Sequence, residues 1–270
     1  MRRYHGFEWE DLPWFPHAWR NYMTDMLQFS FTLGAARAPL VSEKLNQLLD
    51  ATGSDEIVDL CSGSSGPVLW FRQKLEEQRG GPVRVVLTDK YPNLAAFGHC
   101  AEKSGGRVTF RSEPVDATAP PAGLGRVCTM FTCFHHFRPE VARSILANAA
   151  EQRRAIAVFE SSERVVKAML LVLFGGPLAV LLLTPFVRPF RWGRLFWTYL
   201  APVVPLALTW DGVVSCLRSY TVAELTGMTA SLTSEDYRWE VGRARLHGLP
   251  ANTTYVVGYP VGSGARSTGL

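Results

Sequence analysis

The chain of 270 residues lacks several features that mark common classes of protein. Its five cysteines form no C-x-x-C pair, so we expect reduced thiols in a cytoplasmic protein rather than disulfides. His135 and His136 are adjacent and the other histidines lie apart, so no metal-ligand set is predicted. Residues 1–8 contain no apolar run, and we therefore expect no signal peptide.

An excess of charge is also missing. The formal net charge is only +4, and no run of basic residues or RNA-binding signature occurs in the sequence. Nucleic acid is therefore not an expected partner.

Residues 58–67 (Val-Asp-Leu-Cys-Ser-Gly-Ser-Ser-Gly-Pro) are the most informative part of the sequence. Residues 57–60 are apolar or strand-favouring, which predicts a short buried strand, and a helical pattern of apolar residues begins at Pro67. The small residues between them form a loop at a helix N-terminus, where a ligand can approach bare backbone amides. The sequence therefore predicts a cofactor-binding loop.

Two common nucleotide-binding loops do not fit this pattern. No Gly-Lys-Ser/Thr follows the loop, which excludes a phosphate-binding P-loop. The first glycine of G-x-G-x-x-G is missing and no second, substrate-binding domain follows, which disfavours a nicotinamide-binding domain.

Strand and helix patterns alternate through the first 160 residues. This alternation predicts a mostly parallel sheet covered by helices on both faces. Asp89 directly follows the second predicted strand, where an acidic side chain can accept hydrogen bonds from both ribose hydroxyls of an adenosine. After the first strand, we expect further strands at residues 84–88, 107–111, 126–131 and 155–159, and helices at residues 93–104 and 139–152.

Together these residues resemble the motifs of class I S-adenosylmethionine (SAM) dependent methyltransferases. Residues 59–63 resemble the family's first motif, with Cys61 where glycine is commoner, and Asp89 matches its ribose-binding acid. The pair Asp116-Ala117 resembles the pair that contacts adenine, and residues 131–137 lie where the fourth motif closes over the cofactor. The resemblance covers about residues 55–165 and implies SAM as cofactor and S-adenosylhomocysteine as product. The implied cofactor contacts are Asp59, Cys61, Ser62, Gly63, Asp89, Lys90, Asp116, Ala117 and Thr132.

The resemblance also implies the fold and a division of the chain. We expect an α/β, Rossmann-like class I methyltransferase sheet of seven strands, with the last two at residues 237–246 and 253–260 and the last one antiparallel. The layout is similar to a bacterial branch of the class, although that similarity names no substrate. The expected segments are an N-terminal helical lid (1–50), the SAM-binding core (51–163), an apolar helical cap (164–212), the C-terminal completion of the core (213–262) and a disordered tail (263–270).

The N-terminal segment is rich in large aromatic residues, whose spacing from residue 18 predicts a helix with one apolar stripe. N-terminal helices in this family commonly lie over the cofactor cleft, so Trp14, Tyr22 and Met26 are candidate substrate contacts. Tyr220 is a further candidate, where the insertion rejoins the core. The alternative is that the stripe packs against the sheet edge as core. Arg20 is a candidate partner for the cofactor's carboxylate.

The insertion contains residues 168–187, which carry no charge over 20 positions and are long enough to span a bilayer. Since the last strands must return to the sheet, only an even number of crossings is allowed, and Gly175-Gly176-Pro177 is expected to break the stretch. Three alternatives remain open: a buried cap, a two-span hairpin, or a hairpin in one leaflet. In the leaflet alternative, residues 168–210 contact the membrane peripherally. The lipid headgroups would then contact Arg188, Arg191 and Arg194.

The chemistry implied by the resemblance needs a nucleophile held in line with the methyl group and, for some acceptors, a proton acceptor. His135 or His136 is the candidate general base, and the alternative is that each only packs against the cofactor or loop. Glu160 follows the fifth strand and could orient a substrate or a histidine, or cap the next helix.

The predicted function is SAM-dependent methyl transfer to a hydrophobic small molecule, a secondary-metabolite or lipid-like acceptor. One alternative is a non-methylating, SAM-using cyclase on the same fold. A second is a membrane-associated SAM-binding protein without catalysis. The sequence specifies neither the acceptor atom nor the oligomeric state.

Overall fold

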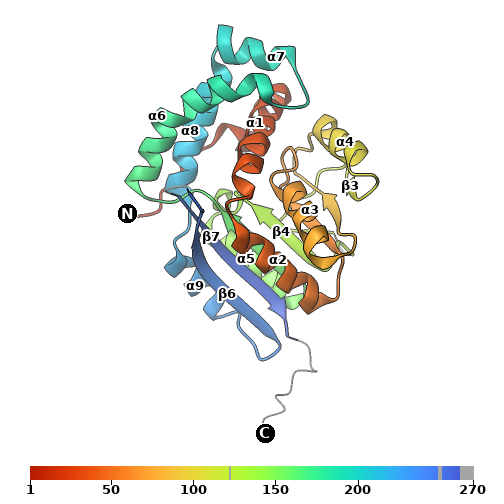
Figure 1. Ribbon diagram of the computed structural model, residues 1–270. Coiled ribbons are helices and arrows are strands. Elements are labelled where there is room, and N and C mark those ends of the chain that lie inside the picture. The colour runs from red at the N-terminus through yellow and green to blue at the C-terminus, as the bar shows by residue number, and fades with distance from the viewer. Residues whose placement is uncertain (122, 249–250, 262–270) are drawn as a thin grey trace.

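A seven-stranded mixed sheet forms the centre of the computed structural model, which describes residues 1–121, 123–248 and 251–261 (Figure 1). The strand order is β3-β2-β1-β4-β5-β7-β6. The predicted tail at residues 263–270 lies outside the described residues. The strands are β1 (Glu56–Leu60), β2 (Arg84–Leu87), β3 (Val108–Phe110), β4 (Val127–Phe131), β5 (Ala155–Glu160), β6 (Tyr237–Arg245) and β7 (Asn252–Pro260).

The first five strands are parallel, and β7 runs antiparallel to both β5 and β6. Parallel strands place their carboxyl ends at one edge of the sheet, so the loops after β1, β2 and β4 meet there. The expected class I methyltransferase fold is thereby confirmed, including the antiparallel last strand. Every predicted strand lies within two residues of its observed bounds because these buried runs are short and separated by strong turn signals.

Helices cover both faces of the sheet. Leu45 and Leu49 of α2 and Phe71 of α3 belong to one buried cluster with the sheet, and Leu146 of α5 and Leu225 of α9 belong to the cluster on the other face. The helices are α1 (His17–Ala35), α2 (Pro39–Thr52), α3 (Val68–Arg79), α4 (Leu94–Lys103), α5 (Pro139–Glu151), α6 (Val166–Leu183), α7 (Trp192–Leu195), α8 (Val203–Arg218) and α9 (Val222–Ala230). The segment predicted as a lid thus divides, since α2 packs on the sheet and only the part before it lies beside the insertion (Figure 1).

The insertion is a helical hairpin of α6 and α8, joined through α7 and a π-helical turn at Phe196–Leu200 (Figure 1). Contrary to the sequence prediction, α6 is not broken at Gly175-Gly176-Pro177 but continues through Pro177. The two helices approach closely, because a Cβ added at Gly212 of α8 would lie 2.8 Å from Cγ1 of Val172 on α6. The second apolar stretch does break, with a bend of 78° between its two parts.

Most of α6 is exposed. Val166–Phe186 has a mean hydropathy of 2.3, and only 6% of its most apolar window is buried, so by length and composition it is a candidate membrane span within the described residues. Leu170, Phe174, Leu178 and Leu182 follow one another at helical spacing and are 49–71% exposed. A fully buried cap is therefore wrong, although the inner face of α6 does cover a cavity. The outer face is a continuous apolar surface, which is unusual for a protein in water.

The arginines of the insertion do not all face outward as the leaflet alternative expected. Arg188 is exposed, but Arg191 is half-buried and Arg194 is 1% exposed. Arg191 and Arg194 both donate hydrogen bonds to Asp25 of α1, at 3.0 and 2.8 Å. The pattern of basic residues alone could not reveal this buried partner, since Asp25 lies more than 160 positions earlier in the chain.

Candidate active site: a cofactor cavity beside an apolar cavity

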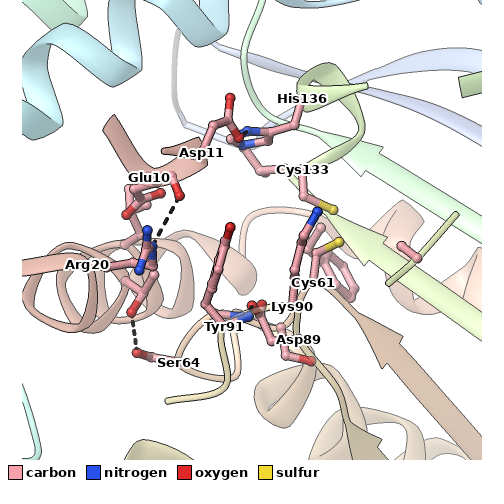
Figure 2. Close-up of a pocket in the computed structure, with 18 of the residues that line it drawn as sticks. Glu10, Asp11, Arg20, Cys61, Ser64, Asp89, Lys90, Tyr91, Cys133 and His136 are labelled. Carbon is pink, nitrogen blue, oxygen red and sulfur yellow. Dashed lines mark hydrogen bonds and ion pairs between the residues drawn. The ribbon is translucent and has the colours of Figure 1, made fainter. Parts of the chain in front are cut away.

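A cavity of about 510 Å³ lies at the carboxyl ends of β1, β2 and β4, beneath α1 (Figure 2). Most of the predicted cofactor contacts lie together on its wall, although the sequence places them more than 70 positions apart. Those in the lining are Cys61, Ser62, Gly63, Asp89, Lys90, Asp116, Ala117 and Thr132.

The loop after β1 adopts a conformation that explains the family's preference for glycine at its start. Cys61 and Gly63 both have φ of 57°, in the left-handed region. A side chain in this region costs roughly 1 kcal/mol, which Gly63 avoids and Cys61 does not. The same turn exposes the amide of Gly63, which donates a hydrogen bond of 2.7 Å to Oδ2 of Asp89.

Asp89 closes the other side of this loop. Its Oδ1 accepts a hydrogen bond from the amide of Tyr91 at 2.7 Å, so both carboxylate oxygens are held by backbone donors. Burial raises the pKa of Asp89 above its usual range, and the two backbone donors oppose that shift. Each oxygen keeps a second lone pair, so the carboxylate can still accept hydrogen bonds from a diol.

Asp116 is more exposed than Asp89. Its Oδ1 accepts from the amide and hydroxyl of Thr118 at 2.9 and 2.7 Å, and its Oδ2 lies 3.6 Å from Nζ of Lys90. Desolvation tends to raise its pKa, but the hydrogen bonds from Thr118 and the nearby Lys90 outweigh it and leave the pKa lowered. Asp116 is therefore a charged acceptor at the cavity mouth.

Asp59, in contrast, does not line the cavity. It is 1% exposed within β1, and its Oδ1 accepts a 2.6 Å hydrogen bond from Thr129 of the neighbouring strand. Its backbone oxygen accepts hydrogen bonds from the side chains of Ser62 and Thr88, so the residue supports the cofactor loop from below. Burial raises the pKa of Asp59 to about 7, against the hydrogen bonds from Thr129 and Ser62.

A second cavity, of about 540 Å³, lies between the sheet edge and the α6/α8 hairpin. Much of its wall is apolar and comes from the inner face of the insertion, including Leu171, Val172 and Val180. The two cavities adjoin, because both are lined by Glu10, Leu27, Phe31, Thr132 and His136.

The paired histidines lie at this junction on a 3₁₀ turn, Phe134–His136, directly after β4. His136 lines both cavities, and its Nδ1 lies 2.7 Å from Oδ1 of Asp11. Figure 2 shows the two side chains next to each other. His135 is 1% exposed and lines only the apolar cavity of the two, and its Nδ1 lies 2.7 Å from Oε2 of Glu160. The carboxylate of Glu160 therefore orients a histidine, which was one of the roles considered from sequence.

The surroundings of His135 favour its charged form. Burial lowers its pKa, but the charge and hydrogen bond of Glu160, together with Glu8, outweigh burial and raise the pKa to about 10. Glu160 also accepts a 2.7 Å hydrogen bond from the amide of Phe134, so its position is fixed from both sides.

The predicted substrate contacts separate in the structure. Met26 is buried and lines the apolar cavity, whereas the other three lie outside the linings of both cavities. Trp14 is 68% exposed, and Tyr22 packs against Gly193 of α7. Tyr220 is buried and donates a 2.7 Å hydrogen bond to the carbonyl of Phe137, so it anchors the loop behind the histidines.

Sequence reasoning missed the acidic N-terminal residues that meet the histidines. Glu8 is 1% exposed and lies against both imidazoles, and Arg218 contacts Glu8 and Asp11 at 2.9 and 2.6 Å. The signal was Glu8-Trp9-Glu10-Asp11, a set of acids inside an aromatic segment. Its place in space could not be inferred, because the segment before α1 has little regular structure to fix its direction.

Comparisons with known proteins give only distant structural similarity. No protein-family model matches the sequence, and no curated protein matches it. An O-methyltransferase family protein from Burkholderia thailandensis is 14% identical with a TM-score of 0.48, over 84% of this chain and 57% of that one. An O-methyltransferase family 2 protein from Planctomyces limnophilus, in complex with apigenin, is 14% identical with a TM-score of 0.48, over 88% and 62% of the two chains. Magnesium protoporphyrin IX methyltransferase from Synechocystis with bound S-adenosylhomocysteine is 10% identical with a TM-score of 0.46, over 84% of each chain.

The chain therefore spans less than two thirds of the length of the first two of these proteins. Similarity at this level does not decide reaction or substrate. The strand order and the motifs are the observations that define the fold. The chain has the fold of class I SAM-dependent methyltransferases.

Proposed function

We propose that the protein transfers a methyl group from SAM to a hydrophobic small molecule. The observation that carries the proposal is the junction of the two cavities at Thr132 and His136. One cavity holds the cofactor motifs and the other is largely apolar, so a donor in the first would face an acceptor in the second. Because SAM carries its own electrophile, holding the two reactants together in this way is the main contribution to catalysis that the protein has to make.

The cofactor cavity suits an adenosine with a charged tail. Its volume of about 510 Å³ is within the range for sites of such ligands. Asp89 offers charged acceptors for a ribose diol, and Asp116 offers one near the adenine position implied by the family resemblance. Arg20 also lies in the lining, with its guanidinium 4.1 Å from the centre of the Tyr91 ring, and it is the candidate for binding the methionine carboxylate.

The apolar cavity suits a lipid-like acceptor. Val172 and Val180 of α6 face it from the inner side of the helix, and Leu171, also in its lining, is 58% exposed, while the outer side of α6 is exposed and apolar. We propose that the outer side rests in one leaflet of a membrane. Arg188 and Trp192 at the hairpin tip are exposed and suit the headgroup region. An acceptor dissolved in the leaflet would then reach the cavity without passing through water.

The test begins with the purified protein and no assumed acceptor. Mass spectrometry of the bound ligand and calorimetry with SAM, S-adenosylhomocysteine and NADH would identify the cofactor. Incubation with SAM and a panel of hydrophobic acceptors should release S-adenosylhomocysteine in stoichiometric amounts with methylated product.

Each rival function gives a different result in this assay. A cyclase would give methylthioadenosine or leave SAM unchanged, and a non-catalytic binding protein would leave it unchanged with every acceptor. Tight binding of NADH in place of SAM would contradict the proposed cofactor.

A further inference from the structure

Glu8, His135 and His136 bring three metal-ligating groups to one point between the cavities. One ligand atom from each, namely a carboxylate oxygen and one ring nitrogen of each histidine, all lie within 4.8 Å of one another. Oε1 of Glu8 is 3.8 Å from Nε2 of His135, and Oε2 of Glu8 is 3.5 Å from Nε2 of His136. Two ligands bound to one tetrahedral zinc ion at about 2.0–2.1 Å would lie about 3.4 Å apart, so the observed spacing is close to that of a metal site.

The same distances are too long for hydrogen bonds between these atoms. Nε2 of His135 is buried and has no hydrogen-bond partner among the described residues, whereas Oε1 of Glu8 is paired with Nη1 of Arg218 at 2.9 Å. A buried ring nitrogen left in this state is costly unless something binds to it. A proton on Nε2 of His135 would not give this nitrogen a hydrogen bond to Glu8, because Oε1 of Glu8 is 3.8 Å away.

The second nitrogen of each ring is already held by a carboxylate. Nδ1 of His135 lies 2.7 Å from Glu160 and Nδ1 of His136 lies 2.7 Å from Asp11. When an imidazole releases its Nε2 proton to bind a metal, Nδ1–H stays with the carboxylate and the lone pair is on Nε2, which is how protein carboxylates orient histidines that bind metals. The Nε2 atoms of both histidines lie on the side of Glu8.

The charges in contact with the site also favour a cation. Three carboxylates (Glu8, Asp11 and Glu160) and two guanidiniums touch the cluster, Arg218 through Glu8 and Arg3 through the carbonyl of His135, which leaves a net charge of −1 when both imidazoles are neutral. The negative balance favours a cation. Two imidazoles and one carboxylate suit zinc or another first-row transition metal better than magnesium or calcium, which prefer oxygen ligands.

We infer that Glu8, His135 and His136 form a binding site for a divalent transition-metal ion such as Zn²⁺. Three protein ligands leave at least one coordination position, and His136 lines both cavities while Glu8 and His135 line the apolar one. The open position therefore faces the space proposed for the acceptor. A metal ion there binds an acceptor oxygen and lowers the pKa of a hydroxyl, a role that replaces a free histidine as general base.

The test uses untagged, chelator-treated protein without SAM, so that it is independent of the proposed methyl transfer. Calorimetry with Zn²⁺ and visible spectroscopy with Co²⁺ should show one ion per chain at micromolar or tighter affinity. Glu8→Gln should weaken Zn²⁺ binding about 100-fold, and Asp11→Asn, which removes only an orienting carboxylate, about 10–100-fold. His99→Gln, on α4 outside the cluster, is the matched control and should bind as the wild type does.

No binding of Zn²⁺ or Co²⁺ to folded wild-type protein up to millimolar concentration would overturn the inference. So would unchanged affinity in both Glu8→Gln and His136→Gln. If a variant does not fold, the wild-type titration and the Co²⁺ absorption bands still decide the question. A protein that binds SAM but no metal contradicts only this inference, and one that binds metal but no SAM contradicts only the proposed function.

Discussion

Arg194 of the insertion donates a hydrogen bond of 2.8 Å to Asp25 of α1, and both side chains are buried. Asp25 also accepts hydrogen bonds from Ser64 of the cofactor loop, at 2.8 Å, and from Asn93, at 3.0 Å. One carboxylate therefore joins the apolar hairpin, the N-terminal helix and the loop that lines the cofactor cavity. The insertion and the cofactor loop are therefore linked by hydrogen bonds to the same side chain.

Removing this carboxylate is expected to be costly. Asp25→Ala leaves the Arg194 guanidinium buried without its partner, which should lower the free energy of unfolding by about 3–5 kcal/mol. Urea denaturation followed by circular dichroism measures the change. The matched control is Asp50→Ala, which breaks an exposed pair with Arg79 and should cost less than about 1 kcal/mol. Equal losses in the two variants would contradict the role assigned to Asp25.

The ribose assignment predicts a selective loss of cofactor affinity. Asp89→Ala removes a charged acceptor of two hydroxyl groups and should weaken SAM binding by about 2–4 kcal/mol, or roughly 30- to 1000-fold in Kd. Asp55→Ala changes an exposed acid that pairs with Arg84 and should leave the affinity unchanged. Calorimetry gives both values, and a thermal melt shows whether the loop held by Asp89 remains folded. Wild-type affinity in a folded Asp89→Ala protein would exclude Asp89 as the ribose acceptor.

Arg20 should distinguish ligands by their tails. It donates hydrogen bonds to the carbonyls of Glu10 and Leu12, yet its Nη1 has no hydrogen-bond partner in the part of the chain that the structure describes. Arg20→Met is therefore expected to weaken S-adenosylhomocysteine about tenfold or more, since one charge-assisted hydrogen bond is lost. Methylthioadenosine has no carboxylate and should bind equally to both proteins. A parallel loss for the two ligands would mean that Arg20 only supports the fold.

The buried acid in β1 predicts a pH dependence of stability. Because the pKa of Asp59 is raised from 3.8 to about 7, the folded protein holds a proton between these values that the unfolded chain has released. This residue's contribution to stability is therefore full below pH 4 and falls as the pH rises, until the loss is complete above pH 7.

Comparison of variants isolates that contribution from other titrating groups. Asp59→Asn cannot ionise, so its free energy of unfolding should decline less than that of the wild type between pH 5 and 7, by an amount on the order of 2 kcal/mol. Asp55→Asn, at an exposed position, should follow the wild type. Parallel curves for Asp59→Asn and wild type would show that Asp59 is ionised in the folded protein at pH 5.

The exposed face of α6 predicts binding to lipid bilayers. Phe174 and Leu178 are 71% and 57% exposed and one turn apart, and burying each in a leaflet contributes about 1.5–3 kcal/mol. The double variant Phe174→Asp/Leu178→Asp should lose co-flotation with liposomes at least tenfold, whereas Leu94→Asp, an equally apolar exposed site on α4, should not.

Two outcomes would contradict a membrane contact. Wild-type protein that never floats with liposomes would exclude it. A dimer in solution that the same double variant dissociates would instead assign the face to a second copy of the chain.

The sequence was most informative where local patterns determine the result. Cys61 and Gly63 follow a strand and precede a proline-initiated helix, so their loop and its place at the sheet edge were predictable. Asp89 followed from the same logic, because it comes just after a strand and parallel strands end at one edge, whereas Asp116 was predicted only from the family resemblance.

The remaining site depends on contacts between distant segments. Glu8 lies beside His135 although the two residues are more than 120 positions apart in the sequence. Local sequence patterns do not predict where an irregular N-terminal segment crosses the sheet edge. Gly175-Gly176-Pro177 misled for a similar reason. The triplet is a helix breaker by local propensity, but packing of α6 against α8 overrides it, and Gly212 of α8 allows the close approach of the two helices. The headgroup role predicted for Arg191 and Arg194 was wrong for the same reason. Their partner, Asp25, is distant in the sequence, so residue spacing could not reveal the pairing.

The length of α6 has a consequence for how the protein would sit on a bilayer. Eighteen helical residues measure about 27 Å, whereas one leaflet offers about 15 Å of hydrocarbon. The helix therefore fits within one leaflet only when it is strongly tilted. The tilt would turn the N-terminal part of α6, which lines the apolar cavity, toward the boundary between hydrocarbon and headgroups. Methyl transfer would then take place at the depth where amphiphilic molecules hold their polar ends, so bilayer thickness and packing would regulate turnover without any change in the catalytic groups.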